Sequence, residues 1–170
     1  LMHLRAIMQG HLTIDQPTAV GMAHLAIRKA NAGLAESADN STAYQVLGEV
    51  YSFLLNVESA IEQSNGVPFE NRLRFNQALG AYHQAILLRP KSLTLRDRML
   101  ELLQRHNRFD LILRELDVIE KLTPATDSED LDESEALQRR LALREQCESR
   151  LTALREQVQF LFSDVHWGDA

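Results

Sequence analysis

The sequence predicts an all-α fold of stacked helix hairpins, and three observations support this class. Apolar residues recur at helical spacing along most of the 170 residues. Only seven glycines and four prolines interrupt this pattern. Two of the prolines, Pro90 and Pro124, lie 34 residues apart in matched settings, Leu-Leu-Arg-Pro and Lys-Leu-Thr-Pro. A fixed period of this size indicates supersecondary units that stack on one another.

Composition narrows the functional classes. The chain has 45% hydrophobic residues, enough for a compact core, and a formal net charge of −6. We expect no nucleic-acid partner, because phosphate binding requires a basic face. No apolar run reaches the ~18 residues of a membrane span. Cys147 is the only cysteine, so we expect neither an internal disulfide nor a zinc site built on cysteines.

The first part of the chain, residues 1–38, has the pattern of a degenerate first repeat. The sequence starts at Leu1 in mid-pattern without an initiator methionine, and we expect it to be a piece of a larger protein. A helical stripe at positions 1, 4, 7 and 8 ends at Gly10. A second helix is expected from about Pro17 to Leu34. Its inner face consists of small and aliphatic residues: Ala19, Ala23, Ala26, Ile27 and Ala30.

The next helix begins near Ser41, after the capping cluster Asp39-Asn40-Ser41. It carries an aromatic residue, a Leu-Gly pair and a tyrosine at helical spacing: Tyr44, Leu47, Gly48 and Tyr51. A later helix has the order small, aromatic, small and proline: Ala78, Tyr82, Ala85 and Pro90. This pattern resembles helices A and B of a tetratricopeptide repeat (TPR). The resemblance implies a short right-handed superhelix of two to three antiparallel hairpins.

The unit from 41 to 90 departs from the family in its length. Gly48 and Ala78 lie 30 residues apart, where the family spacing is about 12. The inserted residues keep helical apolar spacing, which favours continued helix over a disordered insert. We therefore expect a long antiparallel hairpin that turns at Asn65-Gly66 and projects beyond its neighbours.

A repeat of normal length is expected from 92 to 124. Ser92 is placed to cap its first helix, which contains Leu93, Leu95, Met99, Leu100, Leu102 and Leu103. The segment His106–Asp110 resembles the family's turn between helices, with Phe109 as its aromatic residue. A second helix from Leu111 to Leu122 then leads to Pro124.

The last part, 126–170, is expected to be an acidic linker followed by a long helix from about Glu129 to Phe162, either continuous or with one soft break. Apolar residues there follow a spacing of 4-3-4-3, typical of a coiled-coil seam: Cys147, Leu151, Leu154, Val158 and Leu161. Two interpretations stay open. The helix caps the last apolar face of the repeats, as such stacks require, or residues 136–162 form a homodimer or partner-helix interface.

The resemblance also implies a binding surface, because helix A residues of the family line a concave groove for peptides or partner helices. The residues in that register are Gln45, Glu49, Ser52, Asp97, Arg98, Glu101, Gln104 and Arg105. Some family members clamp the terminal carboxylate of a peptide with Asn and Lys. Glu49 and Glu101 stand in the matching places here, so we expect no such clamp.

Chemistry other than binding has little support in the sequence. Glu49 and Glu101 could be taken as paired catalytic carboxylates, but no substrate-positioning motif accompanies them. The six histidines, at 3, 11, 24, 83, 106 and 166, follow no metal-ligand spacing. The acidic run 127–135 lacks the central glycine of a calcium loop. Asn40-Ser41-Thr42 matches a glycosylation sequon, although capping explains these residues equally well.

Together these observations predict a non-catalytic protein–protein interaction scaffold with no metal and no cofactor. The expected partner is a peptide or a helix held in the concave groove. The alternative is a structural or oligomerisation module that acts through the C-terminal helix.

Overall fold

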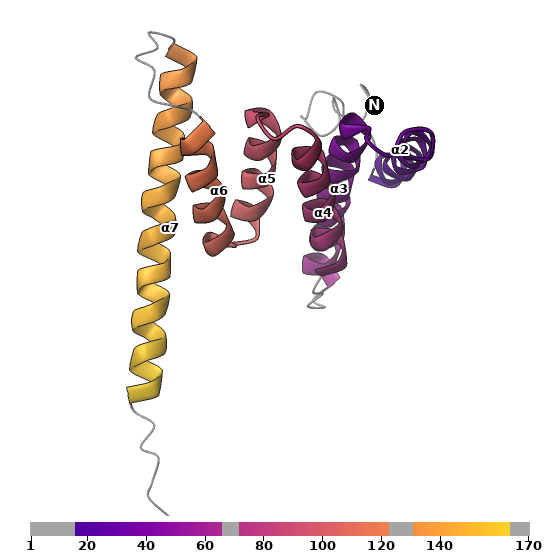
Figure 1. The fold of residues 1–170 in the computed structure, drawn as a ribbon. Helices are drawn as coiled ribbons and strands as arrows, with labels where there is room; N and C mark the ends of the chain where they lie inside the picture. Colours follow the sequence, from indigo (N-terminus) through magenta and orange to yellow (C-terminus); the bar gives the residue numbers. More distant parts are fainter. Residues whose placement is uncertain (1–15, 66–71, 123–130, 164–170) are drawn as a thin grey trace, which may run out of the picture. The chain divides into compact units, whose positions relative to one another are not determined.

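The computed structural model describes residues 16–65, 72–122 and 131–163, and these are helical apart from short turns, with no strand among them (Figure 1). The all-α class is therefore confirmed. The helices are α2 (Gln16–Glu36), α3 (Ser41–Asn65), α4 (Arg72–Leu88), α5 (Leu93–Arg105), α6 (Phe109–Leu122) and α7 (Leu131–Ser163). The helix expected over residues 1–9, the hairpin tip beyond Asn65 and most of the acidic linker lie outside the described residues.

The chain divides into two compact units, Leu1–Met99 and Leu100–Ala170. The division falls within α5, a helix without interruption, rather than at the linker that follows α6. The first unit contains α2, α3 and α4, and the second contains α6 and α7.

In the first unit, α2 packs against α3 through small side chains. Ala23 is fully buried, and Ala26 and Ala30 are nearly so, as the spacing predicted. Because alanines add little bulk, the two helices can approach closely. The larger side chains of the same core come from α3, where Val50 and Leu54 are each 1% exposed.

The start of α3 is fixed by two hydrogen bonds. The Asn40 side-chain oxygen accepts from the Ala43 N–H at 3.0 Å, which makes Asn40 the N-cap. The Ser41 hydroxyl donates to the Ala85 carbonyl at 3.2 Å and so ties the beginning of α3 to the end of α4. The capping cluster seen in the sequence thus has both a local and a long-range partner.

Helices α3 and α4 form the long hairpin of the first unit and lie side by side (Figure 1). A Cβ placed on Gly48 would lie only 2.8 Å from the Cδ1 and Cε1 atoms of Tyr82, so the glycine lies directly against this buried ring. The inserted region continues the helices on both sides, to Asn65 and from Arg72. An ion pair of 3.1 Å between Arg74 and Glu58 joins the two helices there. Leu73, an apolar residue of the same inserted region, is 67% exposed and does not pack into the core.

In the second unit, the turn from α5 to α6 depends on a left-handed residue. Asn107 has a φ of 53°, a conformation that asparagine tolerates better than most residues other than glycine. The Leu103 carbonyl accepts from the N–H groups of His106 and Arg108, at 3.3 and 3.0 Å, and closes α5. Helix α6 begins two residues after Asn107 and buries Ile112, Leu116 and Ile119.

Helix α7 is continuous over 33 residues, so the soft break is not present. It packs against α6, and Cys147 is fully buried. An α-helix rises 1.5 Å per residue, so α6 is about 21 Å long and α7 about 50 Å. The C-terminal half of α7 accordingly extends past the end of α6 (Figure 1).

Candidate functional site

The residues predicted to line a concave groove fall into both units. Gln45, Glu49, Ser52, Asp97 and Arg98 belong to the first unit, and Glu101, Gln104 and Arg105 to the second. Those on α5 are exposed, with the exception of the half-buried Asp97.

The groove residues of α3 are engaged within their own helix. Gln45 donates from Nε2 to Glu49 Oε1 at 2.9 Å, and the Ser52 hydroxyl donates to the Gly48 carbonyl at 2.8 Å. All three side chains are half-buried. A ligand would have to break these hydrogen bonds or bind the side chains in their hydrogen-bonded positions.

An open cleft of about 440 Å³ lies in the second unit, between the α5–α6 turn and α7. Its apolar lining comes from Phe109, Leu143, Ala153 and Leu154, and its polar lining from Gln104, Asn107, Gln146, Arg150 and Gln157. Gln104 is the one member of the predicted groove set among them. Arg150 is the one ionisable residue among the described residues of the lining, which therefore offer apolar surface, amide groups and a positive charge.

One wall of the cleft continues along α7 as an uncovered apolar face. We define the α7 stripe as Leu151, Leu154 and Val158. Leu151 is half-buried, whereas Leu154 is 48% and Val158 50% exposed. Cys147, one turn earlier on the same face, is fully buried. The predicted seam therefore changes character along its length, from covered to uncovered.

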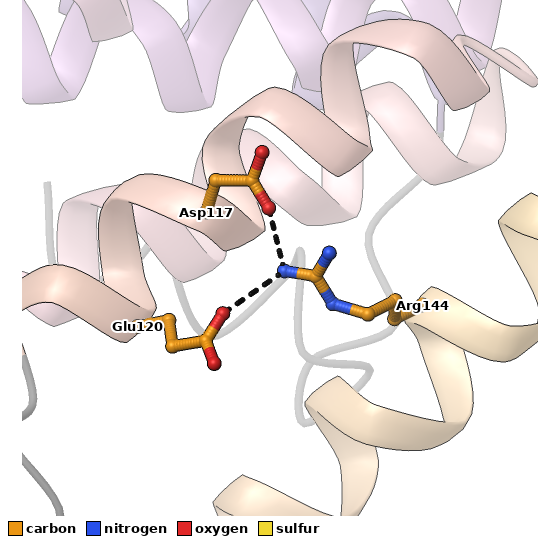
Figure 2. A network of polar contacts seen from close by, with 3 residues as sticks. All are labelled: Asp117, Glu120 and Arg144. Carbon is orange, nitrogen blue, oxygen red and sulfur yellow. Dashed lines mark hydrogen bonds and ion pairs between the residues drawn. The ribbon is translucent and has the colours of Figure 1, made fainter.

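The covered half of α7 is held by a polar contact as well as by packing. One nitrogen of Arg144, Nη2, donates to Asp117 Oδ1 at 2.8 Å and to Glu120 Oε2 at 3.3 Å (Figure 2). Both acids lie on α6. The hydrogen bond to Asp117 is the main cause that raises the pKa of Arg144. In the sequence Arg144 interrupts the heptad, and its contact with α6 explains why an arginine is accommodated on this face.

Two other titratable groups of the second unit have displaced pKa values. Burial lowers the pKa of His106, and the neighbouring charge of Arg105 lowers it further. Burial raises the pKa of the Cys147 thiol, with a smaller contribution from Glu148. Both shifts favour the neutral form, so they mark packed positions rather than an activated nucleophile or base.

The described residues show no cluster suited to holding a metal ion: nowhere among them do three His, Cys, Asp or Glu side chains gather as metal ligands would. Glu49 and Glu101, the carboxylates considered as a catalytic pair, belong to different units. None of the helices, as far as they are described, has the length and apolarity needed to cross a membrane.

Most of the cleft residues were not singled out from the sequence, because they lie around a turn and on a helix face more than 30 residues later in the chain. Of the apolar lining, only Leu154 belongs to the 4-3-4-3 spacing of α7. Of the amide-bearing lining, only Gln104 was predicted, as a member of the groove set. No model of a known protein family matches the chain, and comparison with curated proteins gave no match.

Proposed function

We propose that this chain is a non-catalytic protein–protein interaction module that binds a partner segment on its second unit. The observation that carries the proposal is the α7 stripe beside an open, apolar-floored cleft. Apolar side chains that are half exposed at consecutive helical positions are typical of helix-in-groove recognition. The described lining of the cleft also supports a binding role, since it combines apolar side chains and amide groups with the positive charge of Arg150.

The repeat pattern supports the same class of function. We infer that α3 with α4, and α5 with α6, are hairpins in a TPR-like register, since the 34-residue period and the Gly48–Tyr82 contact both fit that packing. In this register the exposed residues Glu101 and Arg105 of the second unit form a second candidate surface on α5. Their exposure is the observation that favours it.

The α7 stripe also supports the alternative of self-association through the C-terminal helix. The two alternatives differ in solution mass, which light scattering across a concentration range measures directly. A monomer at all concentrations leaves the stripe available for a different protein.

Site-specific photocrosslinking in the cells that make the protein tests the proposal. A benzophenone amino acid would replace Val158 on the stripe, Glu101 on α5, or Arg139 as a control. Arg139 is exposed on α7 away from the stripe and pairs with Glu135. We expect a discrete crosslinked protein from position 158 and none from 139. A product from position 101 alone would move the function to the α5 surface, and equal products from all three positions would contradict a specific interface.

A further inference from the structure

The lengths of α6 and α7 differ, and this difference leaves part of α7 without a neighbouring helix among the described residues. Helix α6 is about 21 Å long and packs against α7, which is about 50 Å long. Beyond the fully buried Cys147, Leu154 and Val158 are about half exposed, as are Leu137 and Leu141 on the earlier part of the helix. The segment from 150 to 161 spans about three helical turns. A single short helix could therefore cover it.

The charged residues next to the α7 stripe are mainly basic. With Leu151, Leu154 and Val158 in the a, d and a positions of a heptad, Arg150 occupies a g position and Arg155 an e position. These two arginines flank the stripe on opposite sides. Glu156 lies at f, on the far side of the helix. No ion pair or hydrogen bond to another described residue engages either guanidinium.

A second copy of α7 fits this surface poorly. In a parallel pair, g and e positions face each other, which sets Arg150 against Arg155 of the other copy. An antiparallel pair centred between Leu154 and Val158 sets Arg155 against Arg155. An antiparallel pair centred between Leu151 and Leu154 would match Glu148 with Arg155, but it requires Cys147 in the new interface, and Cys147 is already buried within its own unit.

On these grounds, and resting on the proposed function, we infer that the α7 stripe binds an amphipathic helix of a different protein whose apolar face is flanked by Asp or Glu. The partner's apolar side chains cover Leu154 and Val158, and one of them enters the cleft beside Phe109. Its carboxylates pair with Arg150 and Arg155. The amides of Gln104 and Asn107 face the partner's polar edge from the other wall of the cleft.

The test uses the full chain and two synthetic peptides of about three heptads each, with leucine at a and d. One peptide carries Glu at e and g, and the other carries Lys there. Binding is titrated by fluorescence anisotropy at about 0.05 M and about 0.5 M salt, because screening separates the charge effect from apolar contact.

The variants are Leu154→Glu, the pair Arg150→Glu with Arg155→Glu, and the pair Arg114→Glu with Arg139→Glu. The last pair alters net charge equally but changes exposed arginines away from the stripe. Circular dichroism verifies that each variant folds.

We expect the Glu peptide to bind at least about tenfold more tightly than the Lys peptide at low salt, with the ratio falling toward one at high salt. Charge reversal at Arg150 and Arg155 inverts the preference between the two peptides, the control pair leaves it unchanged, and Leu154→Glu removes binding.

Equal binding of both peptides would overturn the preference for an acidic partner but not the proposed interaction surface. No binding of either peptide to a monomeric chain would overturn the proposed function at this surface as well. A dimer that dissociates in Leu154→Glu would make a second copy the occupant and overturn the inference.

Discussion

At the residue scale, Gly48 shows why one position accepts only glycine. Any Cβ there would meet the Tyr82 ring at 2.8 Å, and Tyr82 is 3% exposed, so the ring has little space into which to move. Overpacking of this kind costs about 1–3 kcal/mol. We therefore expect Gly48→Ala to lower the free energy of unfolding by about that amount in urea denaturation, and Gly48→Leu to lower it at least as much.

A matched control lies on the facing helix. A Cβ on Gly80 meets nothing within 4 Å, so Gly80→Ala has only the helix-propensity effect and should stabilise by about 0.5–1 kcal/mol. The difference in sign between the two variants isolates the ring contact. Equal responses to both substitutions would contradict the close approach of α3 and α4 at this position.

His106 gives stability a pH dependence whose sign follows from its pKa. Burial lowers the folded-state pKa below the usual value of about 6.5. Between the two pKa values the unfolded chain binds the proton and the folded chain does not, so the free energy of unfolding rises with pH. This stability is fully present above about pH 6.5 and declines as the pH falls from there toward the lower folded-state pKa.

The corresponding measurement compares urea denaturation of the wild type and His106→Gln between about pH 7.5 and 5. We expect the variant to show a shallower decline over this range, because the neutral amide cannot take up the proton. His83 is exposed on α4, so His83→Gln should keep the wild-type slope. An unchanged slope in His106→Gln would assign the pH dependence to other groups.

At the element scale, α7 depends on α6 for its position, and Cys147 reports that contact. The thiol is fully buried, and burial raises its pKa, so labelling by thiol reagents requires α7 to open. Arg144 links α7 to Asp117 and Glu120, both of which are more than half exposed, so the contact contributes only about 0.5–1 kcal/mol. Arg144→Ala should therefore raise the labelling rate of Cys147 about two- to fivefold.

Arg139→Ala is the matched control for this experiment. It removes an exposed ion pair with Glu135 that lies entirely within α7. We expect the Cys147 labelling rate of this variant to equal that of the wild type. A similar acceleration in both variants would mean that helix fraying, rather than separation from α6, exposes the thiol.

The elements themselves were largely predictable because their signals are local. Asn40 and Ser92 cap the helices that the sequence assigned to them, and the start of α6 follows from the turn at Asn107. The all-α class follows from the same signals. Leu73 illustrates the limit of periodicity: its spacing fits a helix, but its exposure depends on whether a distant segment covers that face.

The cleft was less predictable for the same reason. The seam from Cys147 to Val158 is uniform in the sequence, yet its first member is buried and its last is half exposed. The difference arises from the unequal lengths of α6 and α7, which a heptad pattern does not encode. Gln146, Arg150 and Gln157 acquire a role only when the α5–α6 turn lies opposite them.

At the scale of the whole molecule, the two interpretations of the C-terminal helix apply to different parts of it. The first half packs against α6, in which Ile112, Leu116 and Ile119 are buried, and burial of such a side chain contributes about 1.5–3 kcal/mol. A terminal helix with this role is what an open stack of helix pairs requires. The second half extends beyond α6, and we propose that its half-exposed residues Leu154 and Val158 bind a partner rather than stabilise the fold.

This division predicts opposite outcomes for two truncations. A chain that ends at Leu122 lacks the helix that packs against α6, and the lost burial is comparable to the ~5–15 kcal/mol that stabilises a typical domain. We expect it to aggregate or to melt at least about 10 °C lower in circular dichroism.

A chain that ends at Glu156 keeps Cys147 covered, so its Tm and its thiol labelling rate should stay close to those of the full chain. It lacks Val158, however, and should lose binding of the Glu-flanked peptide. If the shorter deletion also lowered the Tm strongly, the second half of α7 would have a structural role, and its apolar residues would no longer indicate a partner.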